Sequence, residues 1–460
     1  MSEQRFDALV QQLETQRIDR RTFLVRAVAL GASVPAIGAA LLRTQPVGAQ
    51  VATPAAGGPA TAAEIGMPGI EHLTTTDKGT IKLYSSWPLT GASEKIGGDS
   101  AEAVRLCLED RGNAAGGFAL EYEALDDGIA ANNGGWDAGK ESENANRVVN
   151  DPDAMVYIAT YNSGASKISI PILNAAEPPM PMITPQATYP GLTKDTPSNA
   201  EGEPEIYYPS GTRNFFRVVP ADDIQGPAAA NWAFSTLGAT KAYVLHDNQL
   251  YGAGVATLFR DTFQSLGGEV VGFEPFDPEA PEYQALMTKV ADAGPDLVYL
   301  GAIVNLNASK LLQDMRALMG PEEVTFLGPD GLVNQDFIEG AGDAAEGAYI
   351  TFAGVPANTL STGAGQDYYT RMSERLGEEP DAYATYAYEA AAVVLQAIDV
   401  AQAKDRTAIL NALAATEGFQ GLLGEWSFSD TYDTTATTMS LNVVKDGAIT
   451  FQEEIAPPAS

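Results

Sequence analysis

The sequence contains little cysteine, little histidine and few basic residues, and each shortage excludes a kind of chemistry. One residue of 460 is cysteine, Cys107, so no disulfide can form within the chain. The two histidines, His72 and His246, stand far apart, which argues against a zinc site. The 27 basic residues are outnumbered by 60 acidic ones, and the net charge of −33 repels phosphate backbones and anionic membrane surfaces. We therefore expect no nucleic-acid partner.

Motifs of nucleotide binding and of hydrolysis are incomplete. The stretch from Gly134 to Lys140 resembles a phosphate-binding loop, but Glu141 follows where a Ser or Thr would hold magnesium. The glycines of Gly252-Ala-Gly254 open a helix, but Thr257 replaces the third glycine of a dinucleotide fingerprint. Residues 126–137 lack the EF-hand order, so a solvated loop is favoured over a calcium site. No Gly-x-Ser-x-Gly elbow follows residue 49, and we expect no enzymatic activity, no cofactor and no metal.

The apolar run near the N-terminus is too short and too diluted for a membrane anchor. Residues 27–42 are moderately apolar, contain two glycines and a proline, and follow Asp19-Arg-Arg-Thr-Phe-Leu24. This combination is typical of a twin-arginine export signal, and Val47-Gly-Ala49 offers small residues at a cleavage site. An ordinary N-terminal core helix is the alternative. We expect a signal peptide over residues 1–49, a flexible leader over 50–79, and a periplasmic or other extracytoplasmic location.

Residues 241–330 alternate between strand and helix patterns. Such units build a parallel sheet, whose ligands bind at the carboxyl ends of the strands. Two polar loops fall at such ends, Asp247-Asn-Gln-Leu-Tyr-Gly252 and Gly328-Pro-Asp-Gly331. The expected strands are 242–245, 270–273, 297–301 and 324–327, and the expected helices are 255–266, 283–293 and 311–319.

An earlier block repeats this pattern. Its expected strands are 81–85, 120–125, 155–159 and 182–185, and its expected helices are 100–110, 140–149 and 168–175, the last with Pro171 near its first turn. Loops at 86–91 and 161–164 follow two of these strands. Two similar lobes imply a cleft between them.

After Gly347 the pattern changes to a strand at 349–352, a long helix at 383–403 and a closing hairpin around Asp446-Gly447. A chain that leaves one lobe, builds the other and returns makes a multi-strand hinge. The predicted fold class is α/β, with two Rossmann-like lobes joined by that hinge. The first lobe takes residues 80–218 plus 352–435, and the second takes 219–351 plus 436–455.

Five of these stretches together resemble a known family. They are Pro88-Leu-Thr-Gly91, Tyr161-Asn-Ser-Gly164, Met182-Ile-Thr-Pro-Gln-Ala-Thr188, His246-Asp-Asn-Gln-Leu-Tyr-Gly252 and Leu327-Gly-Pro-Asp-Gly331. From Ile81 to the C-terminus the chain is similar to the type I periplasmic solute-binding proteins of the leucine, isoleucine and valine binding group, the receptors of ABC importers. The order of five motifs is more specific than any one of them.

The resemblance implies a site for an amino acid between the lobes. The ligand carboxylate would lie at the loop 161–164 and at Thr188, and the ammonium would meet the Gln186 carbonyl and Asp330. Tyr251 would close over the ligand. Asn162 and Ile303 stand where the family commonly has serine and tyrosine, which leaves the ligand side chain open. The residues that the resemblance places in the site are Trp87, Tyr161, Asn162, Ser163, Gln186, Thr188, Tyr251, Ile303 and Asp330. Trp87 is either a pocket wall or a packing residue.

The expected function is therefore that of an exported receptor, a monomer that captures an amino acid of the branched-chain type or a similar one and delivers it to an ABC permease. Short amides, urea and aromatic acids stay open as ligands. One alternative is a sensor that reports ligand to a membrane kinase. Another is an exported enzyme with Asp330 and Tyr251 as acid and base.

Overall fold

The computed structural model describes residues 58–459 except Asn133. The expected signal peptide, residues 1–49, lies outside the described residues. Among the helices that are described, none has both the length and the apolar character needed to cross a bilayer.

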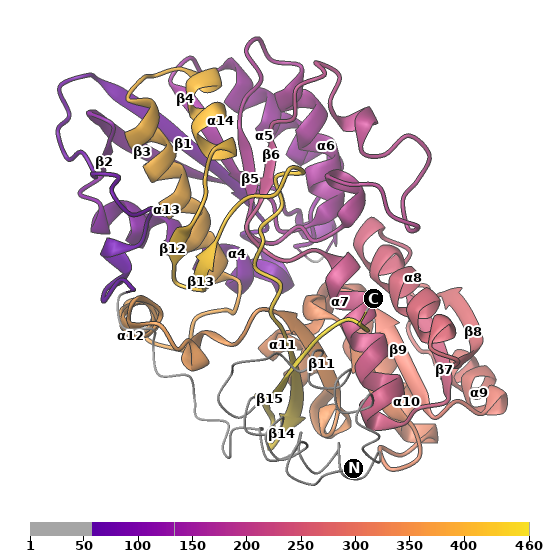
Figure 1. The fold of residues 1–460 in the computed structure, drawn as a ribbon. Coiled ribbons are helices and arrows are strands. Elements are labelled where there is room, and N and C mark those ends of the chain that lie inside the picture. Colours follow the sequence, from indigo (N-terminus) through magenta and orange to yellow (C-terminus); the bar gives the residue numbers. More distant parts are fainter. Residues whose placement is uncertain (1–57, 133, 460) are drawn as a thin grey trace, which may run out of the picture. The chain divides into compact units, whose positions relative to one another are not determined.

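The first lobe is built on a mostly parallel sheet with the order β2-β3-β1-β4-β5-β6. Its central strand β1 pairs in parallel with β3 and β4, and the short β2 pairs antiparallel with β3. The bounds are β1 Thr80–Trp87, β2 Ala114–Ala115, β3 Phe118–Asp126, β4 Ala154–Ala159, β5 Met182–Thr184 and β6 Phe215–Arg217. The helices of this lobe are α4 Glu94–Asp110, α5 Ala138–Asn150, α6 Ser163–Asn174, α13 Ala384–Ala401 and α14 Arg406–Ala414 (Figure 1).

The second lobe has a sheet with the order β15-β14-β11-β10-β9-β7-β8. The strands from β8 to β11 run parallel, whereas β14 and β15 are antiparallel. The bounds are β7 Lys241–His246, β8 Glu269–Pro275, β9 Leu297–Gly301, β10 Thr325–Gly328, β11 Tyr349–Ala353, β14 Met439–Lys445 and β15 Ala448–Ile455. Its helices are α7 Asp222–Asn231, α8 Leu250–Ser265, α9 Gln284–Ala293, α10 Ser309–Leu318 and α11 Gln335–Ala341.

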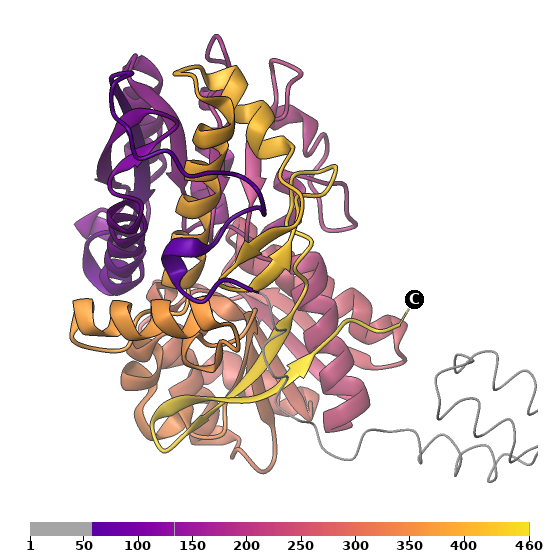
Figure 2. The same ribbon diagram turned by 60° about the vertical axis from the view of Figure 1, so that its left-hand side comes forward.

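Within the described residues the chain passes between the two sheets three times, after β6, after β11 and before β14. Figure 2 shows the last of these passages, where the chain runs from the small β12–β13 pair (Phe419–Gly421 and Gly424–Trp426) into β14 and β15. Helix α12, Gly363–Leu376, lies in the second passage. The predicted α/β fold with two lobes is confirmed.

Several helices differ from their predicted limits. Helix α6 begins directly after the loop at Asn162, so Pro171 lies inside the helix and not in its first turn. Helix α4 begins at Glu94 because the turn at Gly91–Ser93 leads into it without a break. Helices α7 and α12 were not predicted from the sequence. Helix α7 contains Gly226 and Pro227, which interrupt a helical pattern when the sequence is read alone.

Residues 58–79, which we expected to belong to a flexible leader, are packed on the first lobe. Ala62 and Ile65 are buried, and the Ile65 carbonyl accepts a hydrogen bond from Arg111. The His72 ring contacts the Asp399 carboxylate at 2.7 Å, on the buried side of α13. The Ala- and Thr-rich composition suggested a tether, but a few apolar side chains and one buried carboxylate attach this segment to the lobe.

Candidate functional site

A small cavity lies where the strand ends of the two sheets meet. Its described lining residues are Tyr161, Asn162, Ser163, Gln186 and Thr188 from the first lobe, Tyr251, Ile303 and Gly331 from the second, and Tyr383 at the start of α13. We call it the interlobe cavity. Its volume is about 20 Å³, which is room for roughly one water molecule. Of the described residues that line it, none is basic.

The first lobe presents the N-terminus of α6 to this cavity. Strand β4 is buried along its whole length and ends at Ala159, and the chain then turns at Tyr161 and Asn162 into the helix. Asn162 is the N-cap residue, but its side chain makes no capping hydrogen bond. The N–H groups of a helix first turn and the positive end of its dipole favour an anion, so this end of the cavity suits a carboxylate.

The loop after β5 adds polar groups at the same end. Thr184 Oγ1 accepts hydrogen bonds from the N–H groups of Gln186 and Ala187, at 3.1 and 2.9 Å, and so fixes the turn. Gln186 Nε2 donates to Ser100 Oγ at 2.6 Å, while Gln186 Oε1 has no partner although it is buried. A buried acceptor without a donor costs free energy, so this oxygen suits a ligand N–H group.

The second lobe contributes a buried carboxylate, Asp330, in the loop after β10. The hydroxyls of Tyr251 and Tyr383 both donate hydrogen bonds to it. Tyr251 also accepts from the Gly331 N–H at 2.9 Å, which holds its ring against the loop. Burial raises the pKa of Asp330 to about 6, although the two hydroxyls favour the ionised form.

A second carboxylate, Asp222 at the start of α7, lies behind the first. Gln225 joins them, because its Oε1 accepts from the Asp330 N–H at 3.0 Å and its Nε2 donates to Asp222 Oδ1 at 3.2 Å. Asp222 is fully buried, and its Oδ2 has no hydrogen-bonding partner. Burial, and then the charge of Asp330, hold the pKa of Asp222 well above its usual range. Two neighbouring acids attract a cationic group.

The structure brings most of the predicted site residues together. Tyr161, Asn162, Ser163, Gln186, Thr188, Tyr251 and Ile303 line the interlobe cavity, and Asp330 reaches it through Tyr251 and Tyr383. Trp87 does not line the cavity. It ends β1 and is fully buried in the core of the first lobe, as a packing residue would be.

Neither Tyr383 nor Asp222 was predicted from the sequence as a residue of the site. Tyr383 precedes a long apolar helix with two further tyrosines in its first turns, so its sequence context indicates core packing. Asp222 follows the last strand of the first lobe, in a stretch that reads as a domain boundary. The adjacent acids Asp222-Asp223 were the one available signal, and an acidic pair at a helix start is commonly explained by the helix dipole.

The chain is similar in sequence and in fold to known proteins. The sequence is 27% identical over 356 residues to the "Leucine-, isoleucine-, valine-, threonine-, and alanine-binding protein" of Pseudomonas aeruginosa, covering 77% of this chain and 87% of that protein. A leucine binding protein from Thermotoga maritima is similar in structure, with a TM-score of 0.72 and 25% identity over 82% of this chain and 99% of that one.

A third similar protein is an ABC transporter solute-binding protein of R. palustris, solved in complex with benzoate. Its TM-score is 0.67 at 20% identity, and the match covers 83% of this chain and 98% of that one, a likeness that concerns the fold alone. The family model described as periplasmic binding protein matches residues 80–448, which is most of the chain. The chain therefore belongs to the periplasmic binding protein family.

Proposed function

We propose that the protein is the extracytoplasmic receptor of an ABC importer and captures a zwitterionic α-amino acid in the interlobe cavity. One observation carries the proposal: the N-terminus of α6 lines a cavity that has no basic lining residue among those described, and two of its lining tyrosines, Tyr251 and Tyr383, donate to the buried carboxylate of Asp330. An α-amino acid offers an anion and a cation on adjacent atoms. Its carboxylate would face Ser163 and Thr188, and its ammonium would face Asp330.

Binding would require the lobes to separate. The interlobe cavity, at about 20 Å³, has room for roughly one water molecule, so an amino acid cannot enter without a change of shape. Three chain passages between the sheets are suited to a rigid-body rotation about a hinge. A ligand that contacts both lobes would stabilise the closed form, and its preference for that form sets how far it shifts the equilibrium. A permease could then distinguish the loaded receptor.

The ligand side chain would be apolar and of modest size. Ile303 and the rings of Tyr161 and Tyr383 supply carbon surface to the cavity, and the two rings pack edge to face with centroids 6.1 Å apart. Leucine, isoleucine and valine fit such a lining, and the named ligands of the Pseudomonas aeruginosa relative include all three. Hydrophobic pockets of this kind discriminate weakly between side chains that differ by one methylene.

An aromatic acid is a second candidate, because the similar protein of R. palustris was solved with benzoate. Its carboxylate could use the same α6 end. It brings no cation, however, and would leave Asp330 and the unpartnered Asp222 Oδ2 without a charged partner. Short amides and urea also lack a cationic group that could pair with these carboxyls. The acidic pair therefore favours the amino acid.

A thermal-shift screen tests the proposal, because a ligand that binds only the native state raises the melting temperature. Leucine would be compared with isoamylamine, which lacks the carboxylate, with 4-methylpentanoate, which lacks the ammonium, and with benzoate. We expect leucine or a close relative to give the largest shift and both truncated analogues to give little. A larger shift with benzoate or 4-methylpentanoate than with any amino acid would contradict the proposal.

Delivery and export need separate tests. Stoichiometric binding without product, after incubation with amino acids and amides, would separate a receptor from an enzyme that uses Asp330 and Tyr251. Ligand uptake by cells that lack the gene would separate a transport receptor from a kinase-linked sensor.

We also propose export by the twin-arginine route, so replacing Arg20 and Arg21 by Lys should retain the protein in the cytoplasm.

A further inference from the structure

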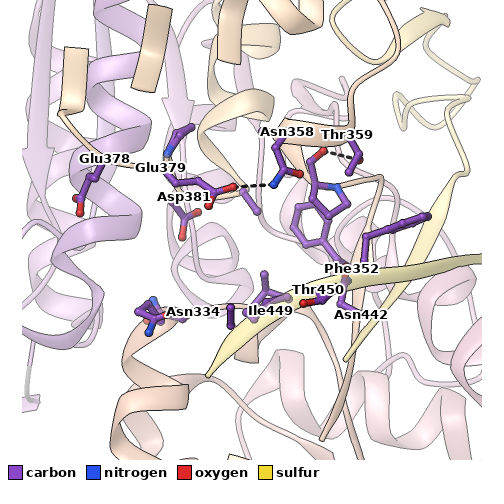
Figure 3. Close-up of a pocket in the computed structure, with 18 of the residues that line it drawn as sticks. Asn334, Phe352, Asn358, Thr359, Glu378, Glu379, Asp381, Asn442, Ile449 and Thr450 are labelled. Carbon is purple, nitrogen blue, oxygen red and sulfur yellow. Dashed lines mark hydrogen bonds between the residues drawn. The ribbon is translucent and has the colours of Figure 1, made fainter. Parts of the chain in front are cut away.

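A second and larger cavity lies beside the hinge. Its volume is about 770 Å³, within the range of cavities that bind drug-sized molecules. Figure 3 shows Glu378 and Asp381 on one side of it and Phe352, Asn442 and Thr450 on the other. We call it the hinge cavity. None of its lining residues belongs to the interlobe cavity.

Both lobes and the hinge contribute to its wall. Lys95 comes from α4 of the first lobe, and Ile449 and Phe451 come from β15 of the second. Phe352 lies near the end of β11, where the chain leaves the second sheet. An occupant would therefore touch elements of both lobes.

The wall combines carbon surface with an excess of negative charge. Phe352, Ile449 and Phe451 offer aromatic and branched side chains. Glu378, Glu379 and Asp381 supply three carboxylates, whereas Lys95 is the only basic residue among the described residues of the lining. The Lys95 ammonium is already bound, at 3.0 Å from Asp99 Oδ2 and 2.9 Å from Glu378 Oε1. Asp381 is 7% exposed and lines the cavity, and its Oδ1 accepts from the Tyr383 N–H.

Two buried amides in the lining are only partly satisfied. Asn334 Oδ1 accepts from the Asp336 N–H at 2.6 Å, but Asn334 Nδ2 has no partner. Asn442 Nδ2 donates to the Ile350 carbonyl at 3.3 Å, but Asn442 Oδ1 has no partner. The two side chains are 5% and 1% exposed. Buried polar atoms without partners cost free energy, so small rearrangements that pair them with an occupant would be favourable.

We propose that the hinge cavity is a second ligand site, which takes an organic amine with an aromatic or branched apolar body. The apolar body packs against Phe352, Ile449 and Phe451, and the ammonium faces Asp381. This proposal does not depend on the nature of the interlobe ligand. An organic acid with the same body is excluded by the carboxylates.

Tryptamine and indole-3-acetate test the site, because they share a ring and differ in charge. Calorimetry on the full chain at pH 8 would compare the unchanged protein with three variants. Thr450→Trp fills the cavity from an exposed position on β15. Asp381→Asn removes the charge but keeps an oxygen for the Tyr383 N–H, which donates to Asp381 Oδ1 at 2.9 Å. Asp330→Asn changes the interlobe site but keeps one side-chain oxygen that can accept from Tyr383, and Asp330 does not line the hinge cavity.

We expect tryptamine to bind and indole-3-acetate not to bind. Thr450→Trp and Asp381→Asn should each weaken tryptamine at least tenfold, and Asp330→Asn should change its affinity less than twofold. Circular dichroism melting would confirm that each variant is folded. No binding of tryptamine at millimolar concentration, equal binding of both probes, or binding that is lost in Asp330→Asn and kept in Thr450→Trp would each overturn the proposal.

Discussion

The hydroxyl of Tyr383, in the first lobe, donates a hydrogen bond to the carboxylate of Asp330, in the second. This bond starts from a residue that lines the interlobe cavity and ties the two lobes together at the carboxylate to which we assign the ligand ammonium. Tyr251 donates to the other oxygen of the same carboxylate from within the second lobe. A ligand ammonium must therefore share Asp330 with two hydroxyls or replace the bond from Tyr383.

Removing the cross-lobe hydrogen bond should open the protein. In Tyr383→Phe the ring keeps its packing against Phe352, but nothing donates to Asp330 from the first lobe. We expect a larger radius of gyration for the ligand-free variant in small-angle X-ray scattering. Tyr388→Phe is the matched control, because the Tyr388 hydroxyl donates to Asp110 Oδ2 at 2.5 Å within the first lobe and does not line the interlobe cavity. Equal radii of gyration for Tyr383→Phe and the unchanged protein would show that this hydrogen bond does not hold the lobes together.

Neutralising Asp330 should abolish tight binding of an amino acid. Asp330→Asn keeps the size of the side chain but removes the charge opposite the ammonium. Leaving a buried charge unpaired costs about 3–5 kcal/mol, a loss of at least a hundredfold in affinity. Calorimetry with the amino acid that gives the largest thermal shift would measure it. Asp343→Asn, an exposed change in the same lobe, is the control and should bind normally. Unchanged affinity in Asp330→Asn would remove Asp330 from the site.

Thr188 should contribute to ligand binding through its hydroxyl group and not through its shape. Thr188→Val has nearly the same volume and should weaken binding by about 1.5–3 kcal/mol, the value of a hydrogen bond to a charged group. Thr188→Ser keeps the hydroxyl and should bind nearly as well as the unchanged protein. Equilibrium dialysis with labelled ligand would compare them. If both variants lost the same affinity, the methyl group and not the hydroxyl would be the important part.

The sequence predicted several strands close to their observed limits. Strand β9 was predicted with its observed limits, because the apolar run Leu297-Val-Tyr-Leu300 follows Asp296 and ends at Gly301. Strand-end loops could be assigned to one cavity because all parallel strands of a sheet end at the same edge. This reasoning needs no knowledge of how the two lobes face each other.

Tyr383 and Asp222 could not be placed in the same way. Tyr383 reaches Asp330 only because the chain returns to the first lobe after building the second. Asp222 approaches Asp330 through Gln225, three residues further along α7. Such contacts depend on how the chain crosses between the lobes, and local composition and periodicity carry no information about that crossing.

Amino-acid binding should be coupled to release of a proton from Asp222. Burial, and then the charge of Asp330, raise the pKa of Asp222, and a ligand ammonium nearby would lower that pKa again. The released proton is taken up by the buffer. The binding enthalpy should therefore differ between Tris and phosphate, and the difference should vanish in Asp222→Asn. Equal enthalpies in both buffers for the unchanged protein would contradict this coupling.

Acid should weaken the same binding through Asp330, whose pKa is about 6. As the pH falls below that value the carboxyl becomes neutral and no longer attracts the ammonium. Affinity should then fall by up to about tenfold per pH unit, and above pH 7 this group should have no further effect. Titrations between pH 5 and 8 would measure the slope. A flat profile across pH 6 would show that the ionised form of Asp330 is not required.

Folding stability should also depend on pH, through the buried carboxyl of Glu389 in α13. It accepts hydrogen bonds from Trp426 Nε1 at 2.7 Å and from the Leu422 N–H at 2.9 Å, yet burial raises its pKa to about 7. The unfolded chain has the lower pKa, so the folded protein holds a proton that the unfolded chain releases. The free energy of unfolding should therefore fall as the pH rises from about 4.5 to 7, and should then level off.

The contribution of Glu389 to this slope is on the order of 3 kcal/mol, since one pKa unit corresponds to about 1.4 kcal/mol. Urea unfolding at pH 5, 6, 7 and 8 would measure it. Glu389→Gln, which cannot titrate, should show a smaller loss of stability across this range. Other carboxyls change the free energy of unfolding equally in both proteins. Asp433, for example, has a lowered pKa and its effect on the pH dependence has the opposite sign. The difference between the two proteins therefore reports on Glu389. Parallel pH profiles for the two proteins would mean that Glu389 is ionised throughout.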